Sequence, residues 1–175
     1  MEGLGRLMET LITKVYEVFA ANTQLFIDAD LQPIRTIDKF RGQTTQPEKF
    51  EIYETPAIFI SWAIKWRREG KMHVGDANID FHIVNDEPSD TASIFTNYDE
   101  ALKEVFFYKT VQKVLDDLEA DGISKLQRLS ETPVDTGVVC YNILSYQTTM
   151  YESSSNSIVV NNVEVEINKG KVKPI

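Results

Sequence analysis

The stretch Pro56–Asp86, PAIFISWAIKWRREGKMHVGDANIDFHIVND, decides the fold of this chain. Its first part, PAIFISWAIKW, is rich in β-branched and aromatic residues, which favour strands, and proline is tolerated at the first position of a strand, where Pro56 stands. The residues RREGK supply a polar turn around Gly70, and KMHVGDANIDFHIVND follows as an antiparallel partner. The sequence therefore predicts a β-hairpin.

The second half of this stretch also matches part of a calcium-loop pattern. The matching residues, at loop positions 1, 3, 5 and 12, are Asp76, Asn78, Asp80 and Glu87. A calcium loop needs glycine at position 6 for its sharp turn, and this chain has Phe81 there. Ile79, Phe81 and Ile83 instead alternate with the residues between them, as in a half-buried strand. We predict a strand and no metal site.

The N-terminal segment Leu4–Phe19 has the apolar period of an amphipathic helix. Its apolar residues, spaced mostly by three and four, are Leu4, Leu7, Met8, Leu11, Ile12, Val15, Val18 and Phe19. The following segment, Ala20–Glu54, is punctuated by Asp, Pro and Gly and predicts only short extended pieces. A connection of this length often has a binding or assembly role.

A second helix is predicted from Asp99 to Ala120, ended by the C-cap signal Asp121-Gly122. Its apolar residues fall on two nearly opposite sides. One side has Tyr98, Leu102, Val105 and Phe106, and the other has Phe107, Val111, Val114, Leu115 and Leu118. Two interpretations remain open: the helix packs on its own sheet and on a neighbouring subunit, or it is fully covered inside one domain.

The next segments predict the strands that close the sheet. KLQRLSE (Lys125–Glu131) is followed by the predicted turn TPVDTG (Thr132–Gly137) and by the long strand VVCYNILSYQTTMY (Val138–Tyr151). We therefore expect an α+β fold in residues 1–152, with a single antiparallel sheet packed against the N-terminal helix and the second long helix.

Residues 153–175 are predicted to be a C-terminal β-hairpin extension, or arm, joined to the domain by a serine-rich segment. Two β-rich runs flank Asn161-Asn162, residues that can adopt the positive φ of a tight turn. Because an isolated hairpin is marginally stable in water, the arm should pair with something. It either completes its own sheet or reaches onto another chain.

The composition limits the classes of function. The chain has 175 residues, 27 acidic against 18 basic, and a formal net charge of −9, which disfavours a protein that grips phosphate backbones. Cys140 is the only cysteine, so no internal disulfide can form. The N-terminus lacks the features of a signal peptide, and no apolar run approaches membrane-spanning length. We expect a soluble protein made in the cytosol and no membrane partner.

The sequence offers little for catalysis. The two histidines, His73 and His82, lie on one predicted hairpin, and a pair with Cys140 would form only if the fold brought their strands together. No zinc spacing and no glycine-rich phosphate loop is present. We predict no catalytic, cofactor-binding or metal site, and no enzyme.

Charged and aromatic clusters are the remaining candidates. The acidic residues Asp116, Asp117, Glu119 and Asp121 end a predicted helix, where negative charge opposes the helix dipole, so they face either solvent or a basic partner. The basic residues of the hairpin tip are Lys65, Arg67, Arg68 and Lys71. Trp62 and Trp66 project from the same face of their strand, as core or interface anchors.

The order of these features resembles that of the tail-terminator and tail-completion proteins of tailed bacteriophages, within the wider group of head–tail joining (neck) proteins. The resemblance covers residues 1–151 and is based on the N-terminal amphipathic helix, PAIFISW, FHIV, the helix YDEALKEVFFYKTVQKVLDDL, and the strands KLQRLSE and VDTGVVCYNILSYQTTMY. The long segment Ala20–Glu54 and the C-terminal extension depart from the family pattern.

This resemblance implies a virion structural protein, without enzymatic activity, that forms a closed ring (a hexamer or dodecamer) at the head–tail junction. DNA would pass through the ring without sequence-specific contacts, and the partners would be identical subunits and neighbouring neck, portal or tail proteins. The alternative is a small intracellular binding or regulatory module of a phage or prophage. The expected subunit contacts are Lys65, Arg67, Arg68, Asp116, Asp117, Ile158, Val160, Val163 and Val165.

Overall fold

The computed structural model describes residues 2–46, 53–85, 98–116, 118–135 and 140–153, with side chains except at residues 2–5, 98–102, 140 and 153. The order of the elements is α1 (Glu2–Ala21), α2 (Thr23–Asp28), β1 (Thr36–Lys39), β2 (Ala57–Glu69), β3 (Met72–Val84), α3 (Tyr98–Leu115), β4 (Gln127–Asp135) and β5 (Cys140–Ser153). The predicted C-terminal hairpin, with Ile158, Val160, Val163 and Val165, lies outside the described residues, as does Asp117.

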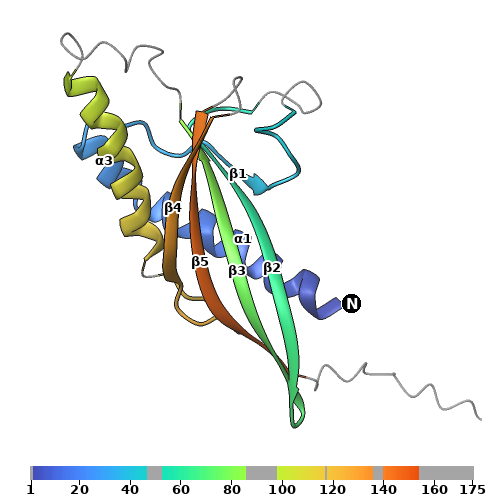
Figure 1. Ribbon diagram of the computed structural model, residues 1–175. Coiled ribbons are helices and arrows are strands. Elements are labelled where there is room, and N and C mark those ends of the chain that lie inside the picture. The colour runs from blue at the N-terminus through green and yellow to red at the C-terminus, as the bar shows by residue number, and fades with distance from the viewer. Residues whose placement is uncertain (1, 47–52, 86–97, 117, 136–139, 154–175) are drawn as a thin grey trace, which may run out of the picture.

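The strands form one five-stranded sheet in the order β1-β2-β3-β5-β4, with α1 and α3 against it (Figure 1). The α+β class and the single sheet are therefore confirmed. The pairs β2–β3, β3–β5 and β4–β5 are antiparallel, whereas the short β1 pairs in parallel with β2, which makes the sheet mixed. Parallel neighbours need a long connection, and residues 40–56 supply it.

The central hairpin is confirmed. Its strands pair from Ala57↔Val84 to Glu69↔Met72, and Gly70 makes the turn with a φ of 60°. Arg67, Arg68 and Glu69, which we assigned to the turn, belong to β2. The strand is longer than predicted because backbone pairing continues past the last apolar residue, Trp66, and polar side chains do not interrupt a ladder in solvent.

The alternation of side chains places the core on the helical side of the sheet. The fully buried residues of the strands on this side include Ile58, Ile60, Ile79, Phe81, Leu144 and Tyr146, and they pack against Leu11 and Val15 of α1 and Val111 and Leu115 of α3. A smaller cluster lies on the opposite side at one end of the sheet and contains Ala57, Phe59, Val84 and Tyr141. Trp62 and Trp66 share the helical side as predicted, and Phe59 belongs to the other cluster.

The segment predicted to hold only short extended pieces contains a helix as well. α1 continues to Ala21, and α2 follows after Asn22. Phe26 of α2 is buried between Phe19 of α1 and Phe107 of α3, with ring centroids 6.2 and 6.0 Å apart. The prediction failed because six residues are too few for a helical period to emerge, and the contact of Phe26 with distant α3 stabilises the turn.

Two predicted boundaries are wrong. α3 ends at Leu115, not at Ala120, because Leu118 turns into the core and accepts a backbone hydrogen bond of 3.0 Å from Leu126. Thr132–Asp135, predicted as part of a turn, continue β4 and pair with β5. Pro133 is tolerated there because β4 is an edge strand, where the missing N–H faces outward.

Candidate interaction surface

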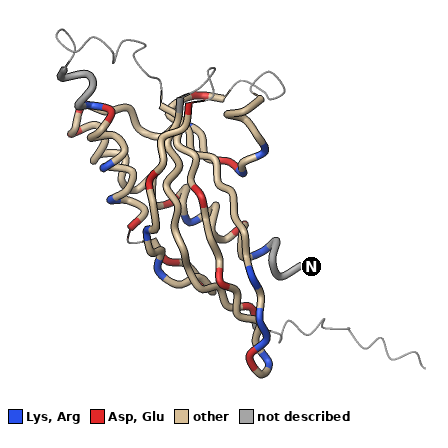
Figure 2. The backbone as a smooth tube through the Cα atoms, in the orientation of Figure 1, with Lys and Arg blue, Asp and Glu red and all other residues tan. Residues whose placement is uncertain are grey.

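The β2–β3 hairpin carries a charged tip, and Figure 2 shows basic residues gathered along its end. The guanidinium of Arg67 binds the carboxylate of Asp76 on β3 and that of Glu69, the latter at 2.8 Å. These hydrogen bonds raise the pKa of Arg67 above its usual range. All three side chains are about half exposed, so the pairs orient the tip and add little to stability.

Of the other predicted contacts on this hairpin, Lys65 and Arg68 are both exposed on β2. Arg68 Nε donates to the carbonyl oxygen of Gly70 at 3.1 Å. Lys65 has no ion-pair or hydrogen-bond partner among the described residues. The hairpin therefore places the predicted basic residues together, and among the described residues Lys65 has no partner.

Asp116, one of the two acidic residues of the predicted interface, binds two side chains of its own chain. Its carboxylate accepts a hydrogen bond of 2.9 Å from Tyr146 Oη and lies 3.7 Å from the guanidinium of Arg128. Burial, together with this hydrogen bond, raises the pKa of Tyr146 above its usual range. A basic partner was one of two alternatives for the acidic cluster. For Asp116 this partner is Arg128 of the same chain.

The predicted two-sidedness of α3 is present in the structure. Phe107, Val111, Val114 and Leu115 are buried against the core, whereas Val105 and Phe106 on the other side are 48% and 52% exposed. The ammonium of Lys109 lies 6.0 Å from the centre of the Phe106 ring. We call Val105 and Phe106 the outer α3 patch. Exposed aromatic residues often anchor contacts between proteins, so this patch is a candidate contact surface.

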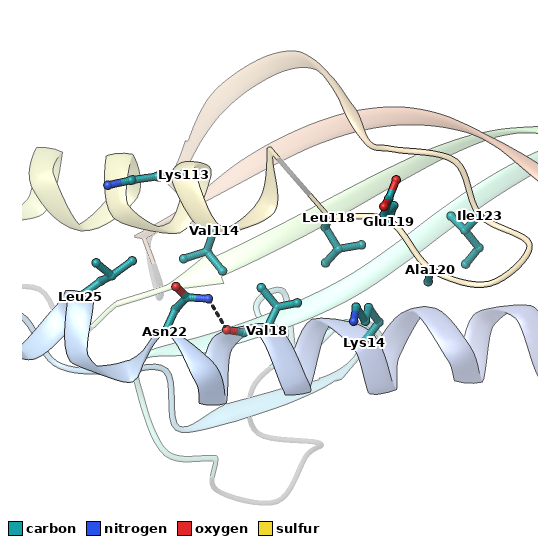
Figure 3. A pocket seen from close by; sticks show the side chains of 10 residues that line it. All are labelled: Lys14, Val18, Asn22, Leu25, Lys113, Val114, Leu118, Glu119, Ala120 and Ile123. Atoms are coloured by element: carbon teal, nitrogen blue, oxygen red, sulfur yellow. Dashed lines mark hydrogen bonds between the residues drawn. The ribbon is translucent and has the colours of Figure 1, made fainter.

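An open groove of about 740 Å³ runs between α1 and the segment that follows α3 (Figure 3). Its apolar lining includes Val18, Val114, Leu118 and Ile123, and Lys14 and Glu119 are among its charged residues. Its described lining mixes apolar and charged groups. The groups whose pKa is shifted, Asp30, Arg67, His82 and Tyr146, do not line it.

His82 lies on the side of the sheet opposite α1. Its ring stacks on Phe40 with centroids 3.9 Å apart, and its Nε2 shares a hydrogen bond of 2.9 Å with Ser61 Oγ. His82 is 7% exposed, and its Nδ1 has no hydrogen-bond partner among the residues that the structure describes. Burial lowers the pKa of His82, and the nearby charge of Asp80 partly opposes this shift. The partners Ser61 and Phe40 could not be predicted from the sequence, because they come from two other segments of the chain.

The two histidines lie at opposite ends of β3, and neither is the cross-strand partner of Cys140. His73 pairs with Glu152, at the end of β5 farthest from Cys140, and it is exposed beside the hairpin tip. His82 pairs with Ile143 and is covered by Phe40. The strand interpretation of the partial calcium pattern is confirmed: Asp76 binds Arg67, and Asp80 accepts a hydrogen bond of 2.6 Å from Ser145 Oγ.

In the part of the chain that the structure describes, no three His, Cys, Asp or Glu side chains are placed to hold a metal ion. None of the described helices has the length and apolar character needed to cross a membrane. No protein-family model matches this sequence, and a search of curated proteins finds no match to it.

Proposed function

We propose that this chain is a structural protein of a tailed bacteriophage and that identical copies of it form a closed ring at the head–tail junction. In this proposal DNA passes through the ring, and the protein has no catalytic role. The ring connects neighbouring neck, portal or tail proteins.

One observation carries the proposal: two different exposed surfaces lie on opposite sides of the molecule. α3, with the exposed outer α3 patch, lies at one side of the sheet, and β2 with its basic residues lies towards the other (Figure 1). When two different surfaces of identical subunits bind each other, the contact repeats head to tail, and it closes into a ring if the rotation per subunit permits.

The charge of the chain is compatible with a channel for DNA. A net charge of −9 provides no general attraction for phosphates, so DNA would slide past such a ring instead of being held. Of the basic residues of β2, Arg67 is already bound to Asp76 and Glu69.

Native mass spectrometry and negative-stain electron microscopy of the purified full chain test the assembly. We expect closed rings of six or twelve subunits, and we expect Phe106→Glu to shift them towards monomers because a carboxylate would be buried at the contact. Tyr16→Glu is the matched control, since Tyr16 on α1 is also an exposed aromatic residue, 64% exposed against 52% for Phe106. A strictly monomeric protein, or one that binds a single unrelated protein one to one, would support the regulatory-module alternative instead.

The location is tested separately. If the chain is a neck protein, antibody labelling of purified virions that encode it should mark the point where the tail meets the head. Absence of the chain from assembled particles would reject the proposed location even if rings form in solution.

A further inference from the structure

The outer edge of β2 is only partly paired. β1 covers Ala57–Ile60, and the last backbone hydrogen bond on this side runs from Phe40 N to Ile60 O at 2.8 Å. From Ser61 to Glu69 no described strand pairs with this edge. Because β3 pairs with the other edge, alternate residues of this stretch turn their backbone N–H and C=O groups outward, where no described strand meets them, and such a row is a template for a further strand.

This edge has two chemically different sides. Trp62, Ile64 and Trp66 lie on the helical side and remain partly exposed. Ala63, Lys65 and Arg67 lie on the opposite side and are exposed. A strand that fits here needs apolar residues on one side and acidic residues on the other.

Lys65 provides the unsatisfied charge. Arg67 is bound by Asp76 and Glu69, whereas Lys65 has no partner among the described side chains. A carboxylate on an added strand would therefore meet a free ammonium group beside it.

The sequence of the C-terminal arm has the matching pattern. In VEVEI (Val163–Ile167), Val163, Val165 and Ile167 alternate with Glu164 and Glu166. Paired with β2, this run would place its apolar residues beside the tryptophans and its acids beside Lys65, because side chains alternate with a period of two. If the added strand were shifted by one residue along β2, its acids would face the tryptophans and its apolar residues would face Lys65.

The position and length of the arm permit this pairing. β5 ends at Ser153, which pairs with Met72 at the hairpin tip, and residues 154–175 follow. Extended chain spans up to about 3.3 Å per residue, so the ten residues from Ser153 to Val163 reach across about 33 Å.

We propose that Val163–Ile167 of one copy adds as a strand to the Ser61–Glu69 edge of β2 in the next copy. The inference rests on the ring proposed above and names one of its contacts. The arm follows β5 in the sequence, whereas the receiving edge belongs to β2, so the contact joins two different parts of the subunit. This is the arrangement that a head-to-tail contact requires.

Disulfide trapping in the full chain tests the contact. In a Cys140→Ser background, Ala63→Cys is combined with Glu164→Cys or with Glu166→Cys, which covers both neighbouring acidic positions. Under mild oxidation we expect covalent dimers, trimers and higher species on a non-reducing gel, all lost on reduction.

Asn78→Cys is the matched control for Ala63→Cys. Asn78 is the exposed cross-strand partner of Ala63 on β3, so it lies one strand farther from the edge. Two strand spacings amount to about 9.6 Å, which is beyond the reach of a disulfide. The control should give no covalent ladder.

Charge reversal gives a second test that does not depend on a chosen register. Lys65→Glu, and separately Glu164→Lys with Glu166→Lys, should each weaken assembly roughly fivefold, the effect of about 1 kcal/mol for an exposed pair. Combining all three changes should restore it.

A cross-link that forms only within one chain, or the absence of any cross-link in protein that still forms rings, would overturn the inference and leave the ring proposal standing. A monomeric wild-type protein without a ladder would overturn both.

Discussion

The indole ring of Trp66 lies against Gly75 on the neighbouring strand. A Cβ atom built on Gly75 would come within 2.9 Å of ring atoms Cε3 and Cζ3 of Trp66, and within 2.8 Å of Ile64 Cγ2. Because Gly75 has no side chain, the indole of Trp66 on β2 can lie over β3 on the helical side of the sheet.

Gly75→Ala should therefore destabilise the fold. The added methyl group must displace Trp66 or Ile64, and overpacking of this kind costs about 1–3 kcal/mol in the free energy of unfolding. Urea unfolding followed by circular dichroism measures it. In a Trp66→Ala background the cost should shrink, and an unchanged cost would show that the ring is not the obstacle.

Phe26→Ala should destabilise the protein strongly, because Phe26 fills the space between Phe19 and Phe107. We expect a loss of about 3–5 kcal/mol in the free energy of unfolding, as for other buried phenylalanines. Ile27→Ala is the control, since Ile27 is the next residue of α2 and is 53% exposed. Equal losses at both positions would contradict the packing of α2 against α3.

Tyr146→Phe should remove the hydrogen bond from Tyr146 Oη to Asp116 and little else. The loss should be about 1 kcal/mol, measured by chemical unfolding near neutral pH. In the control Tyr151→Phe, the hydroxyl is removed from a tyrosine that is 44% exposed, and stability should hardly change. A neutral result for Tyr146→Phe would mean that Arg128 alone satisfies Asp116.

His82 should make the fold sensitive to mild acid. Burial lowers the pKa of His82 in the folded protein below its ordinary 6.5, so the unfolded chain binds a proton first as the pH falls. The stabilising effect of the neutral ring is therefore complete above about pH 6.5 and declines as the pH falls towards the folded pKa.

The variant His82→Gln should lack this part of the pH dependence. Between about pH 7.5 and 5.5 the wild type should lose up to about 1 kcal/mol more of its free energy of unfolding than the variant does. If His82→Gln has the wild-type slope, other groups control the acid sensitivity.

Part of the proposed contact surface could be predicted from the sequence. The positions of Lys65, Arg67 and Arg68 on the hairpin followed from its strand–turn–strand pattern, and the exposed side of α3 followed from the spacing of its apolar residues. The partners of Asp116 could not be predicted, because Tyr146 and Arg128, to which it binds, come from β5 and β4.

Local periodicity alone determined α1, α3, the central hairpin and the face that each turns to the core. These elements have enough residues for the period of a helix or strand to show, and burial of one face follows from it. Only the tertiary structure decided that β1 pairs in parallel with β2, that Phe26 orders a short helix, and that Ser61–Glu69 has no described neighbour at its edge. Each of these depends on contacts between residues distant in the chain, and the pattern of a single segment does not record which distant strand or ring will lie beside it.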